Sequence, residues 1–253
     1  MKVENANFMC ELLKTAASYS IPLFWGVKNN GQSVVANNGT AFILNTGKRT
    51  FVVTAAHVYE AYIKSINSGE GEKSQLANIE FDLSERLISC IGSSIIDIAT
   101  FEITPQEIST LGKSVLFGSN SVWPPSKCFE GQAIVIAGFP GLERMQIVNK
   151  SYSFGAHCFN TPASSVSERH FGCSLDRKHW IDLFGKGFPE KNFDLGGISG
   201  APALALEEST QGIISWRLAG IVYEANASEL MGEIVFSYHT KFIGELGAIL
   251  SNA

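Results

Sequence analysis

The 253-residue chain contains no long apolar run, no cluster of basic residues and no low-complexity tract. No segment reaches the roughly 18 apolar residues of a transmembrane helix, and the first twenty residues lack the apolar core and cleavage site of a secretory signal. The net charge is −5, and the basic surface by which proteins bind nucleic acid is missing. We therefore expect a cytoplasmic protein with no membrane or nucleic-acid partner.

The cysteines are too few and too scattered for a disulfide framework. There are five, an odd number, and wide stretches of chain separate them. This usage is typical of reduced thiols in a protein that needs no covalent crosslink to fold. They are Cys10, Cys90, Cys128, Cys158 and Cys173.

What the sequence does contain is a series of short β-rich runs. With 45% hydrophobic and 17% charged residues, the composition is that of a packed globular protein. From residue 22 to about 240, apolar and β-branched runs alternate with polar turns, which predicts a barrel or a sandwich without internal repeats. The runs are IPLFWGV, GTAFIL, RTFVVTAA, SIIDIATFEI, GQAIVIAGF, APALAL, GIISWRLAGIVYEA and EIVFSYH.

Helical periodicity is confined to the two ends of the chain. Apolar residues recur at helical spacing over residues 6–19 and again over residues 240–251, so each segment predicts an amphipathic helix. The residues that define the two faces are Phe8, Leu12, Leu13, Ala16 and Tyr19 at the first end, and Phe242, Leu246 and Ile249 at the second.

A Pro-Pro pair within SNSVWPPSKCFEG, residues 119–131, marks a place where a central strand cannot continue. We expect a helical segment over residues 1–20, a first β lobe over 21–124 and a second β lobe over 125–253.

Three short stretches carry chemistry. His57 follows two alanines in FVVTAAHVYE, Asp97 stands among isoleucines in SIIDIATFEI, and Ser199 is surrounded by glycines in DLGGISGAPAL. A carboxylate in an apolar run needs a hydrogen-bond or cationic partner, and a glycine-rich loop can expose a nucleophile and aim the N–H groups of Gly197 and Ser199 at one point. Taken singly, each stretch also fits a structural role: a core histidine, a strand-end aspartate or a plain turn.

Taken together, TAAH, DIATFEI and GISGAP resemble the histidine, aspartate and serine motifs of the chymotrypsin-like, or trypsin-like, serine peptidases, in that family's order. The similarity extends over residues 22–251, since GTAFIL, GQAIVIAGFPG and LAGIVYEA resemble further strands of the family. The resemblance implies an all-β fold of two six-stranded Greek-key β-barrels, here with a short N-terminal helix and a C-terminal helix.

The resemblance also implies roles for the three residues. Ser199 would be the nucleophile, His57 the general base and Asp97 the group that orients the imidazole, with the N–H groups of Gly197 and Ser199 forming the oxyanion hole. The substrate would be a peptide or a protein, and no cofactor is implied.

One departure from the family bears on regulation. In the secreted branch an aspartate precedes the serine and pairs with a new N-terminus, but Ile198 holds that position here. We expect a non-zymogen, intracellular type of enzyme that does not need N-terminal cleavage, whether or not a regulatory partner controls it.

Specificity is less well defined by the resemblance. Counted back from the serine, Phe193 falls where the trypsin branch carries its acidic specificity residue, and Asp194 lies next to it. Tyr223, Glu224 and Ala225 fall on the strand edge where the family binds substrate as an added β-strand. We assign these five residues to substrate binding and leave the preferred substrate residue open.

Two other chemical interpretations fit less well. An α/β-hydrolase would use Ser199 and His239, but Ala201 replaces the second glycine of G-x-S-x-G and Pro202 opens a β-like run. A phosphate-binding loop fails because GKRT at residue 47 lacks the upstream glycine.

A zinc site would need the histidines and cysteines of the second lobe, whose spacing is irregular and lacks a C-x-x-C pair. They are His157, Cys158, His170, Cys173 and His179. We expect no metal. The alternative outside enzymology is a peptidase fold that serves as a peptide-binding module or scaffold.

Overall fold

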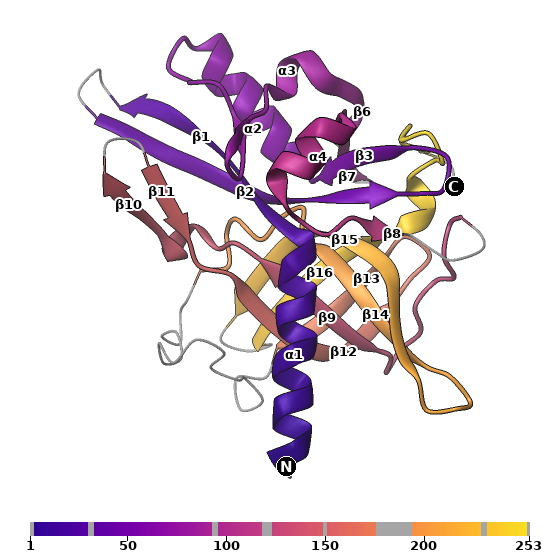
Figure 1. Cartoon of the computed structure of the whole chain (residues 1–253). Helices are drawn as coiled ribbons and strands as arrows, with labels where there is room; N and C mark the ends of the chain where they lie inside the picture. The colour runs from indigo at the N-terminus through magenta and orange to yellow at the C-terminus, as the bar shows by residue number, and fades with distance from the viewer. Residues whose placement is uncertain are drawn as a thin grey trace.

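The structure, a computed structural model, describes residues 3–29, 33–92, 96–117, 123–148, 151–175, 194–228 and 232–251. These residues form two β lobes, one above the other in Figure 1, with a long N-terminal helix beside the lower lobe. No helix in the described part of the chain is long and apolar enough to span a membrane.

The upper lobe contains an eight-stranded sheet with short helices around it. Seven strands run in the order β5-β4-β1-β2-β3-β7-β6, and β8 pairs with β2 in parallel. The strands are β1 (Ser20–Asn29), β2 (Ser33–Asn45), β3 (Thr50–Thr54), β4 (Gln75–Leu76), β5 (Ile79–Glu80), β6 (Leu87–Gly92), β7 (Asp97–Glu102) and β8 (Leu116–Phe117), and the helices are α2 (Ala56–Asn67), α3 (Leu83–Arg86) and α4 (Pro105–Leu111).

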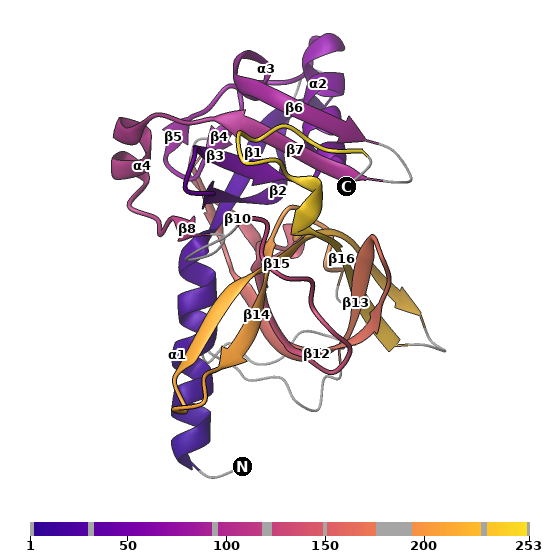
Figure 2. The same ribbon diagram turned by 90° about the vertical axis from the view of Figure 1, so that its right-hand side faces the viewer.

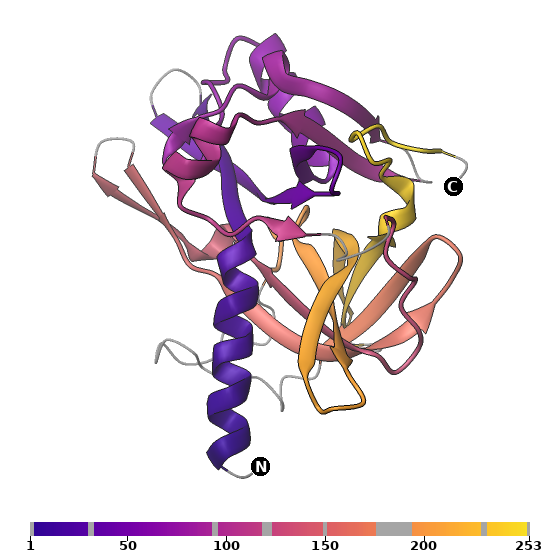
Figure 3. The same ribbon diagram turned by 45° about the vertical axis from the view of Figure 1, so that its right-hand side comes forward.

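The lower lobe is a closed six-stranded barrel in the order β12-β13-β16-β15-β14-β9. A two-stranded hairpin, β10-β11, extends from it toward the ends of β1 and β2 (Figures 1 and 3). The bounds are β9 (Ala133–Gly138), β10 (Arg144–Val148), β11 (Ser151–Phe154), β12 (His157–Val166), β13 (His170–Leu175), β14 (Pro202–Glu208), β15 (Ile214–Ser228) and β16 (Gly232–His239), with 3₁₀ turns η1 (Gly141–Glu143) and η3 (Thr240–Phe242).

The predicted β architecture is confirmed in its coarse form. The chain is mostly β, and its second half closes a six-stranded barrel. Within the described residues the strands of the first half form an extended sheet, and no pairing closes it into a second ring. The segment between β8 and β9, part of which lies outside the described residues, separates the strands of the two lobes.

Three short helices in the upper lobe were not anticipated from the β-rich pattern. Helix α4 shows the local signals that fix such an element: Thr104 caps it in a reciprocal capping box with Glu107, Pro105 opens it, and Gly112 ends it at a φ of 59°. Helix α2 begins directly after β3 and buries one face against the upper-lobe core.

The N-terminal helix α1 (Val3–Tyr19) is present and begins three residues earlier than predicted. It runs along the outside of the barrel (Figure 2) and contacts β9 and β12. Leu12, Leu13 and Ala16 are buried in the apolar cluster between the lobes, and the indole of Trp216 donates a hydrogen bond of 3.3 Å to the Tyr19 hydroxyl. The helix is therefore part of the packed body.

The predicted C-terminal helix over residues 240–251 is wrong. Only the single 3₁₀ turn η3 forms, after which Ile243 and Ile249 pair as an antiparallel bridge. Gly247 lies between them at a φ of +90°, in the left-handed region that helical residues do not adopt. The apolar spacing therefore reflects a tight turn with buried isoleucines at its base.

This C-terminal turn packs on the upper lobe, although it follows the last barrel strand. The Thr100 hydroxyl donates to the Gly247 carbonyl (2.5 Å), and the Thr46 hydroxyl donates to the Glu245 carbonyl (2.6 Å). Helix α1 precedes the upper-lobe strands but packs on the barrel, and the C-terminal turn follows the barrel strands but packs on the upper lobe. The two lobes therefore cannot separate without breaking both of these contacts.

Replacing Leu13 with alanine should destabilise the protein by about 2–4 kcal/mol, because its side chain is only 2% exposed in the cluster between the lobes. Phe8→Ala is the matched control on the same helix, since Phe8 is 47% exposed. Urea unfolding measures both. Equal effects of the two substitutions would contradict the packing of α1 described above.

Candidate functional site

His57 lies in the first turn of α2, immediately after the buried strand β3. Ala55 and Ala56 are fully buried, so the chain enters the helix without bulky side chains beside the imidazole. The His57 side chain itself is 48% exposed and faces the pocket described below.

Asp97, the first residue of β7, holds His57 at two points. Its Oδ1 accepts the backbone N–H of His57 at 2.8 Å, and its Oδ2 lies 2.5 Å from the imidazole Nδ1. The flanking Ile96 and Ile98 are fully buried in the core between the lobes. The strand therefore anchors the carboxylate, and the carboxylate fixes both the position and the orientation of the ring.

The pKa of His57 is raised above its ordinary value near 6.5. Burial is the largest single influence and lowers the pKa, but the hydrogen bond and charge of Asp97 act in the opposite direction, with smaller contributions from Glu60 and Glu224. The net effect stabilises an imidazolium at this position.

Ser199 lies in the loop before β14, and its backbone is fixed from both sides. Its carbonyl accepts the N–H of Thr40 on β2 (2.9 Å), and the next N–H, that of Gly200, donates to the Val222 carbonyl on β15 (2.7 Å). Gly200 has a φ of +90°, and a Cβ there would lie 2.0 Å from the Thr40 carbonyl oxygen. Only glycine permits this close approach of the loop to β2.

The peptide between Gly196 and Gly197 has a defined orientation. The Gly196 carbonyl accepts the N–H of Gly141 at 2.7 Å, and the Gly197 carbonyl accepts the Thr40 hydroxyl at 2.8 Å. In a trans peptide the N–H points opposite to the carbonyl, so the Gly197 N–H is directed away from Gly141. Among the residues that the structure describes, neither this N–H nor that of Ser199 has a hydrogen-bond partner, as an anion-binding pair of donors requires.

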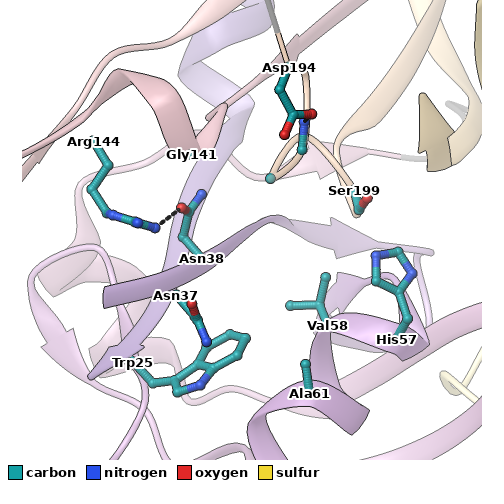
Figure 4. A pocket seen from close by; sticks show the side chains of 12 residues that line it. Trp25, Asn37, Asn38, His57, Val58, Ala61, Gly141, Arg144, Asp194 and Ser199 are labelled. Atoms are coloured by element: carbon teal, nitrogen blue, oxygen red, sulfur yellow. Dashed lines mark hydrogen bonds between the residues drawn. The ribbon is translucent and has the colours of Figure 1, made fainter. Parts of the chain in front are cut away.

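A pocket of about 280 Å³ joins these residues. Figure 4 shows His57 and Ser199 at one end and Arg144 with Asn38 at the other. Its lining residues come from both lobes: Trp25, Asn37, Asn38, His57, Val58, Ala61, Gly141, Arg144, Asp194, Gly196, Gly197 and Ser199.

The Ser199 hydroxyl is oriented toward the main chain of β15. Its Oγ lies 3.5 Å from the Tyr223 carbonyl oxygen, a long hydrogen bond. Figure 4 draws the serine and the imidazole at the same end of the pocket, and among the described residues no hydrogen bond joins the two side chains. Hydrogen bonds between a nucleophile and its base are often long or misaligned in ligand-free sites.

The predicted substrate-binding residues divide into three groups. Phe193 lies outside the described residues. Asp194 lines the pocket, and its Oδ1 accepts the N–H of Gly196 at 2.7 Å. Tyr223, Glu224 and Ala225 lie on β15 behind Ser199 and do not line the pocket, although Glu224 affects the pKa of His57.

The histidines and cysteines considered above as zinc ligands lie on β12 (His157 and Cys158) and β13 (His170 and Cys173). His179 is outside the described residues. In the described part of the chain, no group of three or more His, Cys, Asp or Glu side chains could hold a metal ion. Burial raises the pKa of Cys158 and of Cys173 to about 12, so these thiols stay protonated.

Sequence reasoning missed Thr40, Asn38 and Arg144. The Thr40 hydroxyl, fully buried, links the Gly197 carbonyl to the N–H of Phe139 (3.0 Å), and Asn38 connects the Phe139 carbonyl (2.8 Å) to the Arg144 guanidinium (2.7 Å). Thr40 is the second residue of the GTAFIL run and Asn38 directly precedes it, and only this placement could have drawn attention to them. Nothing in the sequence around Arg144 places it near the serine loop.

Comparisons with known proteins leave the family open. No family model and no curated protein matches this chain. One similar solved structure comes from work on aromatic interactions that drive the coupled folding and binding of the intrinsically disordered Sesbania mosaic virus VPg protein. It is 14% identical, with 88% of this chain and 85% of that chain covered, at a TM-score of 0.44. A likeness at this level carries no argument about function.

Thr40→Val should destabilise the protein by about 1–3 kcal/mol, because an isosteric methyl leaves the Phe139 N–H and the Gly197 carbonyl without a partner. Thr40→Ser keeps the hydroxyl and is the matched control. Chemical denaturation measures both, and a serine variant as unstable as the valine variant would contradict this role of the hydroxyl.

The His57–Asp97 contact predicts a pH-dependent contribution to stability. Because the folded-state pKa of His57 is raised, the contact adds stability that is complete below pH 6.5 and is lost as pH rises through the folded-state pKa. Asp97→Asn should therefore cost more stability at pH 5.5 than at pH 9. It should also lower the pKa of His57 in an NMR titration, and an unchanged pKa would rule out Asp97 as the stabilising group.

Proposed function

We propose that this protein is a serine endopeptidase that cleaves peptide bonds through a covalent acyl-enzyme on Ser199. The observation that carries the proposal is the two-point contact of Asp97 on His57 at the end of a pocket that also contains Ser199. The motif resemblance of the sequence to chymotrypsin-like peptidases points to the same three residues in the same roles.

In the first step, Ser199 Oγ attacks the scissile carbonyl carbon while His57 Nε2 removes the hydroxyl proton. The C–N bond then breaks, the proton passes from the imidazolium to the departing amine nitrogen, and the acyl group remains on Ser199. A water molecule, deprotonated by the same imidazole, releases the carboxylic acid and restores the serine. The raised pKa of His57 suits a base that must hold a proton between these steps.

Asp97 acts as an orienting group in this scheme. Its Oδ2 accepts the Nδ1–H of His57, which leaves Nε2 without a proton and free to serve as the base. Its Oδ1 fixes the backbone at the same residue. The carboxylate also stabilises the positive charge that appears on the ring after the serine proton is transferred.

The N–H groups of Gly197 and Ser199 would bind the oxygen that becomes negative in the tetrahedral intermediate. They have no other partner among the described residues, and the hydrogen bond from Gly141 to the Gly196 carbonyl keeps the first of them turned away from Gly141. Preorganised donors of this kind are worth about 10²–10³ in rate each.

The edge of β15 beyond the end of its pairing with β14 would hold the acyl side of the substrate as an additional strand. Its pairing with β14 ends at Ile221, whereas its pairing with β16 continues to Ser228. A β-bulge leaves Tyr223 out of the register with β16, and its carbonyl lies beside Ser199 Oγ. Main-chain bonding along Tyr223, Glu224 and Ala225 would place a peptide carbonyl at the serine.

Two finer assignments belong to this proposal. The upper lobe corresponds to a second, incompletely closed Greek-key barrel, so that the site lies between two related lobes. The enzyme is of the intracellular type that needs no N-terminal cleavage, with peptides or proteins as substrates and no cofactor.

The alternative is a peptide-binding module that uses the same groove without chemistry. The observation in its favour is the hydroxyl of Ser199, whose hydrogen bond goes to the Tyr223 carbonyl. A chemical probe of serine reactivity separates the two.

The intact protein should react with a fluorophosphonate probe at Ser199 and cleave peptides in a proteome-derived library at neutral pH. Ser199→Ala should abolish labelling and lower cleavage by several orders of magnitude while the melting temperature stays unchanged. Mass spectrometry of the labelled protein should give the full chain plus one probe. Labelling only after loss of N-terminal residues would contradict the non-zymogen assignment, and peptide binding without labelling would favour the module.

A further inference from the structure

Arg144 lies at the far end of the pocket from His57 and Ser199 (Figure 4). It is the first residue of β10, on the hairpin that extends from the barrel, and its Nη1 donates to Asn38 Oδ1 at 2.7 Å. Asn38 is held in turn by the Phe139 carbonyl at 2.8 Å. A neutral amide thus fixes the guanidinium, and no described carboxylate pairs with its positive charge.

No carboxylate of the described residues forms an ion pair with Arg144, although several other basic side chains in the molecule have such partners. Burial lowers the pKa of Arg144 and Tyr152 acts in the opposite direction, yet an arginine remains charged at neutral pH. A partly desolvated cation with free N–H donors binds a carboxylate more strongly than an exposed lysine does.

Asp194 is the only carboxylate among the described residues that line the pocket. It lies on the loop that leads to Ser199, between the two ends of the pocket in Figure 4, and its Oδ1 already accepts the Gly196 N–H. Its negative charge disfavours a ligand carboxylate on that side. At the end of the pocket away from His57, the Arg144 guanidinium is therefore the cation available to a ligand carboxylate.

In the peptidase proposed above, the pocket would lie on the leaving-group side of the scissile bond. The acyl side of the substrate is assigned to the edge of β15, and none of Tyr223, Glu224 and Ala225 lines the pocket. Trp25, Val58 and Ala61 give it an apolar floor, with Val58 and Ala61 on the side of His57 (Figure 4), while Arg144 and Asn38 make its far end polar.

Arg144 is within reach of the first residues beyond the scissile bond. A Cβ at Gly197 would lie 2.8 Å from Asn38 Nδ2, and the other end of the same amide is 2.7 Å from Arg144 Nη1. One amide group and two short contacts thus separate the serine loop from the guanidinium. An extended chain advances about 3.3 Å per residue, so about three residues cover this span.

We propose that Arg144 selects substrates with a carboxylate within the first three residues after the cleaved bond. The carboxylate is either an acidic side chain or the C-terminal carboxylate of the substrate. This inference depends on the peptidase function proposed above and adds the chemistry of its leaving-group subsite.

The experiment compares the cleavage sites of the intact protein, Arg144→Gln and Arg144→Glu in a proteome-derived peptide library. Arg49→Gln is the matched control, because Arg49 does not line the pocket and pairs with Glu102. A peptide cut by the intact protein is then synthesised with Glu, Gln or Lys at the selected position, and with a free or an amidated C-terminus. The ratio of kcat/KM between these peptides is taken within each variant, so that a general loss of activity cancels.

For the intact protein and the Arg49→Gln control, the carboxylate peptide should be cleaved about tenfold faster than its neutral counterpart. The ratio should fall to about one in Arg144→Gln, and Arg144→Glu should prefer the Lys peptide. Preference for Glu over Gln at an interior position identifies the side chain as the ligand. If the enzyme cuts two or three residues from the C-terminus of the peptide, and amidation of that terminus abolishes cleavage, the C-terminal carboxylate is the ligand of Arg144.

Equal rates for carboxylate and neutral peptides in the intact protein would overturn the assignment of Arg144, as would a preference that survives in Arg144→Gln. Both results leave fluorophosphonate labelling of Ser199 intact, so the peptidase function would stand. If Ser199 is not labelled and no peptide is cut, the proposed function fails, and the role of Arg144 fails with it.

Discussion

The close approach of the serine loop to β2 is the constraint on which the site depends. Thr40 donates its N–H to the Ser199 carbonyl and its hydroxyl to the Gly197 carbonyl, and its own carbonyl accepts the Thr54 hydroxyl on β3 at 2.7 Å. One buried residue of the upper lobe thus fixes two peptides of the lower lobe. A side chain at Gly200 would overlap the Thr40 carbonyl, so this contact forms only with glycine at that position.

The contact matters because the site is divided between the lobes. His57 and Asp97 belong to the upper sheet and its adjoining helix, whereas Ser199 and Gly197 precede a barrel strand. Any sliding of one lobe on the other would separate the imidazole from the serine. The Thr40 hydrogen bonds oppose this sliding at the pocket. Two further contacts oppose it far from the pocket: α1 packs on the barrel, and the C-terminal turn packs on the upper sheet.

Sequence patterns predicted what depends on local spacing and missed what depends on tertiary approach. The barrel strands follow from their β-branched runs, and the apolar neighbours of Asp97 predict that its carboxylate needs a partner. Only the motif resemblance named His57 as that partner. The prediction of a C-terminal helix was wrong because the spacing of apolar residues does not show that the chain reverses at Gly247. Arg144 was missed because its position depends on Asn38, 106 residues away in sequence, and no local pattern contains that contact.

Apolar packing and main-chain hydrogen bonds hold the serine loop in place. Ile198 holds the position at which zymogen-type members of the resembled family carry an ion-pairing aspartate. Its side chain is only 1% exposed in the apolar core of the barrel. It packs so closely on Gly138 that a Cβ added to this glycine would lie 3.0 Å from the Ile198 Cβ. Hydrophobic packing below the loop and the Gly141 hydrogen bond to the Gly196 carbonyl together orient the Gly197 N–H. Neither interaction involves a charged terminus, so the conformation of the loop is set by folding itself.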